Sequence, residues 1–398
     1  MSATDLVTVK VKKDSIRLVA LLMTSSVTVM SGTTIVAVMP KISVYFQDVP
    51  NTELLVRLLL TTPFLFTAIT APIAGYVVDR LGRKLILILS VIVFGIAGTS
   101  GLYLNSLFTL IIGRALLGIS IGGILTACIA LTADYYKRDE RQRMMGVQVA
   151  FMGFGAVVFL SLGGVLGDIH WRAPFLSYAI AAIILPGCIF YINEPENIEK
   201  QETHISKVGK DKFPYLIIIS IYFLNFIHIS VFYLIPVLIP FFLQDLSYTR
   251  SFHIGLILAG MNLLSALISL TYGKLKLHFS FLEIAFSAFL FLGIGFIIIS
   301  FSTGLKMILF GLIITSLSLG LFWPNANLWV NTVIPFQFRG RAIGMLATCT
   351  YLGMFLSPII AQPFTTYYGI ATTFGIIGTV STGLGIILFL FSLKNGQC

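Results

Sequence analysis

Charge is scarce in this chain. Only 11% of its 398 residues are Asp, Glu, Lys or Arg, whereas 57% are hydrophobic. A soluble protein of this length needs far more charge to cover its surface, so the composition excludes a soluble globular fold. Crossing a bilayer with helices takes about 20 mostly apolar residues for each span. The composition therefore predicts an all-α membrane protein with many transmembrane helices.

Groups that build metal and redox sites are rare as well. The chain has four cysteines, of which Cys128, Cys188 and Cys349 lie inside apolar runs and Cys398 is the last residue. No Cys and His cluster has the spacing of a metal site, and no glycine-rich phosphate loop is present. We therefore expect no disulfide, no metal, no cofactor and no ATP-driven step. The short loops leave no room for a soluble catalytic domain, so we expect that the protein is not an enzyme.

Carboxylates are missing from the middle of every apolar run. The 16 Asp and Glu residues lie in loops or near the ends of runs. Glu53, Asp134 and Glu283 are those near the ends of runs. A protein that exchanges protons for substrate in the membrane usually carries a carboxylate in its cavity. The residues themselves therefore give no direct indication of proton coupling.

Twelve apolar runs make up most of the chain. They lie at about residues 16–40, 53–78, 85–104, 107–135, 144–167, 173–192, 213–243, 252–272, 281–302, 305–333, 342–364 and 367–392. The longest hydrophilic segment, residues 193–212, divides them into two sets of six and is typical of a linker. The pattern predicts an N-terminal six-helix bundle (residues 1–192), a cytoplasmic linker (193–212) and a C-terminal six-helix bundle (213–398).

The net charge of +10 is distributed unevenly between the loops. With the N-terminus inside, twenty of the 26 Lys and Arg residues fall on the inner side of the membrane and Arg114 lies within a span. The remaining five fall on the outer side: Lys41, Arg57, Arg172, Arg250 and Lys306. Cytoplasmic loops of membrane proteins carry such an excess of Lys and Arg. The charge therefore predicts cytoplasmic termini and argues against binding to nucleic acid.

The two halves of the chain are repeats of each other at a constant offset of 198 residues. At this offset Gly75 aligns with Gly273, Arg141 and Arg143 with Arg339 and Arg341, Gly146 with Gly344, and Gly155 with Gly353. Each pair lies at an equivalent place in its half, which indicates a duplicated six-helix unit. Because six is even, both copies enter the membrane from the same side. The repeats are therefore parallel and related by an axis along the membrane normal.

One charged turn stands between two apolar runs: Gly75-Tyr-Val-Val-Asp79-Arg80-Leu-Gly82-Arg83-Lys84. It resembles the signature loop of the major facilitator superfamily, G-x-x-x-D-R-x-G-R-K, at every defined position. The resemblance extends over nearly the whole chain and is strongest to the twelve-span drug:proton antiporter branch. It implies the major facilitator fold, with twelve transmembrane helices in two pseudo-symmetric bundles.

The resemblance implies that the signature loop is a conformational latch made by Gly75, Asp79, Arg80, Gly82, Arg83 and Asp134. Asp79 would accept hydrogen bonds from the N-terminus of the eleventh span, near Ala342, and Arg83 would pair with Asp134. Such a latch contributes on the order of 1–3 kcal/mol to the balance between two states. The alternative is that these charges only anchor the topology, although an anchor needs cations and no acid.

Other segments also resemble motifs of this family. Arg114-Ala-Leu-Leu-Gly118 in the fourth span is similar to R-x-x-x-G, and Trp171-Arg172 with Phe175 fits W-R-x-x-F. The helix-packing motif of the fifth span is matched by Gly155, Gly163 and Gly164, but Phe159-Leu160 replaces the family's Gly-Pro. In the first span Gly32 stands where many drug exporters carry an aspartate.

In this fold the first, fourth, seventh and tenth spans line a central cavity. Their polar side chains are candidate residues for proton or substrate binding: Thr28, Ser31, Arg114, Tyr222, Asn225, His228, Trp323, Asn327 and Asn331. Histidine is the side chain whose ordinary pKa lies nearest neutrality, which makes His228 a candidate for proton exchange. For each residue the alternative is a hydrogen bond between helices, or for Ser and Thr a bond to their own backbone. For Arg114 it is a bond to helix-end carbonyls.

The resemblance implies a secondary active transporter that works by alternating access. We expect a monomeric protein of the plasma (bacterial inner) membrane that exports small hydrophobic or drug-like organic compounds, driven by a proton gradient. The alternative is an importer or facilitator of a small nutrient or metabolite, which the two departures at Gly32 and Phe159-Leu160 favour. A receptor or scaffold without transport is a third hypothesis, against which the intact signature loop argues. The partners are a small-molecule substrate and the lipid bilayer.

Overall fold

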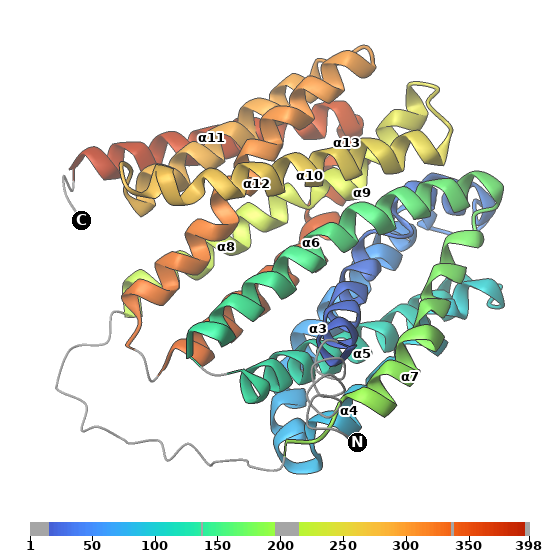
Figure 1. Ribbon diagram of the computed structural model, residues 1–398. Helices are drawn as coiled ribbons and strands as arrows, with labels where there is room; N and C mark the ends of the chain where they lie inside the picture. Colours follow the sequence, from blue (N-terminus) through green and yellow to red (C-terminus); the bar gives the residue numbers. More distant parts are fainter. Residues whose placement is uncertain (1–15, 137, 196–214, 336–337, 395–398) are drawn as a thin grey trace, which may run out of the picture. The chain divides into compact units, whose positions relative to one another are not determined.

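The computed structural model describes residues 16–136, 138–195, 215–335 and 338–394, and every regular element in these ranges is a helix (Figure 1). Eleven helical segments are long and apolar enough to cross a membrane. The last of them, α13 (Arg339–Lys394), consists of two helices joined at Gly369, whose φ of 78° is left-handed. Counting both parts of α13, the described residues contain twelve spans, which confirms the predicted all-α membrane fold.

The helices follow the predicted apolar runs closely. In the first half they are α2 (Met39–Tyr45), α3 (Thr52–Leu81), α4 (Arg83–Gly98), α5 (Leu107–Tyr135), α6 (Arg138–Ile169) and α7 (Ala181–Tyr191), with 3₁₀ segments η1 (Val27–Gly32), η2 (Val36–Val38), η3 (Thr99–Leu102) and η4 (Ala173–Ile180). In the second half they are α8 (Tyr215–Phe232), α9 (Leu234–Asp245), α10 (Ser251–Lys276), α11 (Phe281–Ser300), α12 (Leu305–Val333) and α13.

The first and seventh spans are interrupted, each for a local reason. The first span is helical over residues 16–26 and then tightens into η1 and η2, where Thr28 Oγ1 donates to the Ser25 carbonyl at 2.6 Å. Ser and Thr side chains that bond nearby carbonyls in this way compete with the regular helix ladder. The seventh span breaks between α8 and α9 because, in a continuous helix, the ring of Pro236 would clash with the carbonyl of Phe232, where α8 ends.

Distances between Cα atoms divide the chain into two compact units. The first unit comprises Met1–Thr34, Thr62–Phe159 and Arg172–Lys212, and the second comprises Ile35–Thr61, Leu160–Trp171 and Phe213–Cys398. The second unit therefore includes one end of the first, second and fifth spans together with the C-terminal half. The predicted division into 1–192, 193–212 and 213–398 stays a prediction, and most of the predicted linker lies outside the described residues.

Each unit has its own packed interior. In the first unit α4 packs on α5 and α7, around a core that includes Phe94, Leu117 and Tyr178. In the second unit α11 packs on α12 and α13 through small residues. A Cβ atom added at Gly295 would lie 2.8 Å from the Gly311 carbonyl oxygen, so the helices cross too closely for a side chain there. Such small-residue crossings are typical of membrane helices.

Candidate functional site

The signature loop is a tight turn between α3 and α4. Gly82 has a φ of 95° and a ψ of 148°, a backbone conformation that is essentially restricted to glycine. A Cβ atom there would also lie 3.1 Å from the Glu194 Oε2 atom. At Gly75, by contrast, a Cβ atom would stand at an ordinary 3.9 Å from Thr126 Cγ2. The structure therefore gives a steric reason for glycine at position 82 and none at position 75.

Arg83 is the buried centre of this loop. Its side chain is 8% exposed, with Nε 3.1 Å from Asp134 Oδ2 and Nη2 3.5 Å from Asp79 Oδ1. The guanidinium thereby joins the ends of α3 and α5 to the start of α4. Arg80 lies outside this cluster and stacks over the ring of Tyr76 at 4.3 Å. The predicted contact of Asp79 with the eleventh span, and the role of the cluster as a latch, stay predictions.

Glu194 completes the loop, and no sequence signal marked it. Its Oε1 atom accepts a hydrogen bond from the Arg83 backbone N–H at 2.8 Å, and its Oε2 atom accepts one from Lys84 N–H at 2.8 Å. These are orphan donors at the N-terminus of α4, where a carboxylate is favourable. The contact joins residues 110 positions apart in the chain, so local spacing could not reveal it.

Arg114 lies inside α5 and is 1% exposed. It donates hydrogen bonds to the Ser31 carbonyl and, at 2.8 Å, to the hydroxyl of Tyr178, which in turn donates to the Met30 carbonyl at 3.0 Å. The guanidinium thus binds the end of η1 directly through the Ser31 carbonyl and, through Tyr178, the Met30 carbonyl. The buried side chain of Thr28 bonds its own backbone in the same span.

The candidate residues of the seventh span lie between packed helices. Tyr222 Oη donates to the Ala342 carbonyl at 3.0 Å, and Asn225 Nδ2 donates to Thr350 Oγ1 at 2.9 Å. His228 is fully buried, with Nε2 2.7 Å from Ser318 Oγ. These side chains therefore link α8 to α13 and α12. Their predicted roles in proton or substrate binding stay predictions.

Phenylalanine rings enclose His228 in the interior of the second unit. Its ring stacks on Phe322 at a centroid distance of 3.8 Å and meets the edge of Phe289 at 5.3 Å. The Nδ1 atom has no hydrogen-bond partner among the described residues.

In the tenth span the three candidate side chains, Trp323, Asn327 and Asn331, are more exposed than their neighbour Asn325. Trp323 is 41% exposed, while Asn327 Nδ2 donates to the Trp323 carbonyl and Asn331 Nδ2 to the Asn327 carbonyl, both at 2.9 Å. Asn325, which the helical spacing did not select, is fully buried and bonds Tyr272 Oη at 3.1 Å. Burial between helices, rather than periodicity, distinguishes Asn325 from its neighbours.

The glycines of the fifth span lie at two helix crossings. A Cβ atom at Gly155 would lie 3.1 Å from Ser26 Cβ in the first span. At Gly164 it would lie 2.8 Å from the Ser251 carbonyl oxygen, where α6 crosses α10. Gly163 is buried beside it. Asp168 lies four residues beyond Gly164. Its Oδ1 atom accepts a hydrogen bond from Ser251 N–H at 2.7 Å and so caps the start of α10.

A comparison with known families decides what this arrangement belongs to. The family model described as "Major Facilitator Superfamily" matches residues 21–275 and 218–396. The chain belongs to the major facilitator superfamily. This confirms the resemblance read from the signature loop, and it makes the protein a transporter and not an enzyme. Within the described residues, no group of three or more His, Cys, Asp or Glu side chains is placed to hold a metal ion.

Two curated relatives of this superfamily member are resistance proteins. The chain is 23% identical to "Quinolone resistance protein NorA" of Staphylococcus aureus over 359 residues, which cover 88% of this chain and 91% of that protein. It is 32% identical to "Multidrug resistance protein 1" of Bacillus subtilis over 167 residues, which cover 41% of each. The second alignment thus spans less than half the length of that relative.

Solved structures share the fold. The xylose transporter XylE from E. coli, in an inward open conformation, superimposes with a TM-score of 0.76 at 14% identity and 95% coverage of both chains. A bacterial homologue of the human lysosomal transporter Spinster superimposes with a TM-score of 0.75 at 16% identity. At these identities the likeness shows the fold alone.

Proposed function

We propose that this protein exports small, largely apolar organic compounds across the bacterial plasma membrane by alternating access, driven by the proton gradient. The observation that carries the proposal is the alignment with the quinolone resistance protein, which covers 88% of this chain and both of its halves. The aromatic and aliphatic spans also suit apolar ligands better than sugars, which require many hydrogen-bonding groups.

The charge distribution supports the topology of the proposal. Twenty of the 26 Lys and Arg residues fall on the side that holds the signature loop, and this excess supports a cytoplasmic location of the loop and of both termini. The protein acts as a monomer of two six-helix bundles that rock about a site near the bilayer midplane. It needs no cofactor, since the gradient supplies the free energy.

The geometry of the signature loop supports a role in switching. Arg83 pairs with Asp79 at the end of α3 and with Asp134 at the end of α5, while Glu194 binds the start of α4, so these contacts hold the helix ends together as one corner. The 72% exposed carboxylate of Asp79 stands at the edge of this corner. A rigid corner with an accessible acid can bind the N-terminus of a moving helix in one state and release it in the other.

Accumulation of a fluorescent apolar dye or a quinolone in cells tests the proposal. Cells that lack the protein should accumulate more of the compound than cells that express it, and a protonophore should abolish the difference. The same measurement is made in cells that express Asp79→Asn, which should insert into the membrane normally but should not restore export. Depletion of the compound in cells lacking the protein would refute export.

Import of a nutrient is the second candidate, and two substitutions favour it. Gly32 stands where drug exporters often carry an aspartate, and Phe159-Leu160 replaces the Gly-Pro of the antiporter motif. An importer would give the opposite result in the accumulation experiment.

A further inference from the structure

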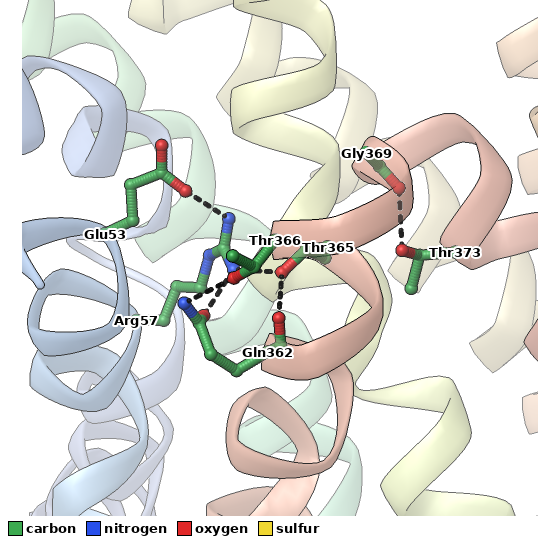
Figure 2. Close-up of polar contacts among 7 residues, drawn as sticks. All are labelled: Glu53, Arg57, Gln362, Thr365, Thr366, Gly369 and Thr373. Carbon is green, nitrogen blue, oxygen red and sulfur yellow. Dashed lines mark hydrogen bonds and ion pairs between the residues drawn. The ribbon is translucent and has the colours of Figure 1, made fainter.

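A buried arginine lies at the end of α3 opposite the signature loop. Arg57 is one of the five cations assigned to the outer side, yet its side chain is only 1% exposed. Figure 2 shows its polar contacts. Exposed arginines at a membrane surface need no explanation, but burial of a charge is costly unless the charge is paired and hydrogen-bonded. The surroundings of Arg57 must therefore compensate this cost.

Neutral groups on α13 accept two of the hydrogen bonds that compensate this cost. The Arg57 Nη1 atom donates to Gln362 Oε1 at 3.0 Å and to Thr365 Oγ1 at 3.0 Å. The guanidinium also lies 5.3 Å from the ring centroid of Phe241 on α9. Its carboxylate partner, Glu53, binds Nη2 at 3.0 Å from the same helix but is 66% exposed, so water screens this ion pair on the carboxylate side. A residue of the second span is thus held chiefly by two helices of the C-terminal half.

The acceptors on α13 are oriented by hydrogen bonds within α13 itself. Gln362 Nε2 donates to Thr366 Oγ1 at 3.2 Å, which turns its oxygen toward Arg57 (Figure 2). Thr365 Oγ1 donates its own hydrogen to the Gln362 carbonyl at 3.1 Å and therefore presents a lone pair to the guanidinium. Gly369, four residues after Thr365, ends this part of α13 and begins the twelfth span. The cluster thus lies at the turn between the last two spans.

The cost of burying Arg57 is only partly offset, because one of its hydrogen-bond donors has no acceptor. Its Nε atom is buried and has no hydrogen-bond partner among the described residues. Separation of α3 from α13 would return the guanidinium to water and restore its full hydration, while it would cost only bonds to neutral groups. A contact with these properties can be made and broken within one transport cycle.

We propose that Arg57, Gln362 and Thr365 form a clasp that holds the outer side of the transporter closed and opens when that side opens. This inference rests on the proposed alternating access. It assigns the second span a conformational contact at each end: the signature loop at one end and Arg57 at the other. Because Glu53 is exposed, it assists the clasp without being essential to it.

Distances between two spin labels test the clasp directly. One label replaces Gln47 in the loop before α3 and the other replaces Tyr367 at the end of the eleventh span, both exposed positions in a background without native cysteines. In lipid nanodiscs Arg57→Ala should raise the ratio of long to short distances about ten-fold over the unsubstituted chain. Gln362→Ala, which keeps the cation, should raise it about five-fold, and Glu53→Gln by less than two-fold.

Arg172→Ala is the matched control, because Arg172 is a cation of the same side that hydrogen-bonds Leu102, Leu104 and Asn105 within the N-terminal half. It should leave the distances unchanged. If Arg57→Ala does not yield folded protein, Gln362→Ala decides the question alone.

An unchanged distance distribution in both Arg57→Ala and Gln362→Ala would overturn the clasp. A response of Arg172→Ala equal to that of Arg57→Ala would overturn it as well. If the distances lengthen as expected in a protein that exports none of the compounds tested, the clasp is supported and the export proposal is refuted.

Discussion

Each end of α3 has a buried arginine, and the two arginines are compensated in different ways. At the signature loop Arg83 is buried against two carboxylates, Asp79 and Asp134, from helices of the same compact unit. At the opposite end Arg57 is buried against neutral oxygens of α13, and its one carboxylate partner, Glu53, is an exposed residue of its own helix. Opposite charges within one bundle make a permanent corner, whereas neutral acceptors on another helix make a contact that water can replace. Arg83 therefore stabilises the fold of its own bundle, whereas the contacts of Arg57 depend on the conformational state of the transporter.

Arg83→Ala should have the largest effect on this comparison. It leaves Asp134 without its partner and removes the link between α3, α4 and α5, so we expect transport to fall more than ten-fold and the thermal midpoint in detergent to fall by several degrees. Arg83→Lys serves as the control, because it keeps the charge and loses the paired geometry. Wild-type turnover in Arg83→Ala would show that the corner is dispensable.

Gly82→Ala should have an intermediate effect on stability. A side chain at φ 95° is strained by about 1–3 kcal/mol and would also press on the Glu194 carboxylate. The matched variant is Gly75→Ala, for which the described neighbours leave room and which improves helix propensity by about 1 kcal/mol. Differential scanning fluorimetry should place the midpoint of Gly82→Ala below that of Gly75→Ala. Equal midpoints would contradict the assigned turn geometry.

Asp168→Asn should have the smallest effect. The substitution keeps an oxygen that can accept the Ser251 N–H bond and removes the charge at the start of α10, which is worth about 0.3–1 kcal/mol. It also removes the ion pairs of Asp168 with Lys41 at 3.7 Å and Arg250 at 4.0 Å, which are partly exposed and contribute little. Transport should change less than two-fold. Asp168→Ala, which removes the acceptor too, should change it more, and an identical result for the two variants would show that the cap contributes nothing.

The sequence alone could predict the features that depend on local pattern. The twelve spans follow from apolar runs of bilayer length, and the signature loop is visible because three cations and an acid cluster where charge is otherwise rare. The turn at Gly82 follows from its place between two helices. The turn at Gly369 between the last two spans lies two residues after the predicted start of the last apolar run, residue 367.

Contacts over long sequence distances could not be predicted in this way. Charge counting treated Arg57 as one surface cation among five, because its partner Gln362 is 305 positions away. Glu194 and Asn325 carry no periodicity that separates them from their neighbours. Whether a polar side chain in a span bonds another helix or faces a cavity depends on how helices pack, which one sequence does not state.

Transport in proteoliposomes with an imposed pH gradient tests the central claim most directly. Purified protein is reconstituted, an apolar fluorescent dye is supplied on the side of the cytoplasmic face, and dye movement is followed with and without a protonophore. We predict movement toward the acidic compartment that the protonophore abolishes and that Asp79→Asn reduces several-fold. Dye movement that is insensitive to both the gradient and Asp79→Asn would contradict the account of a proton-driven exporter switched by its signature loop.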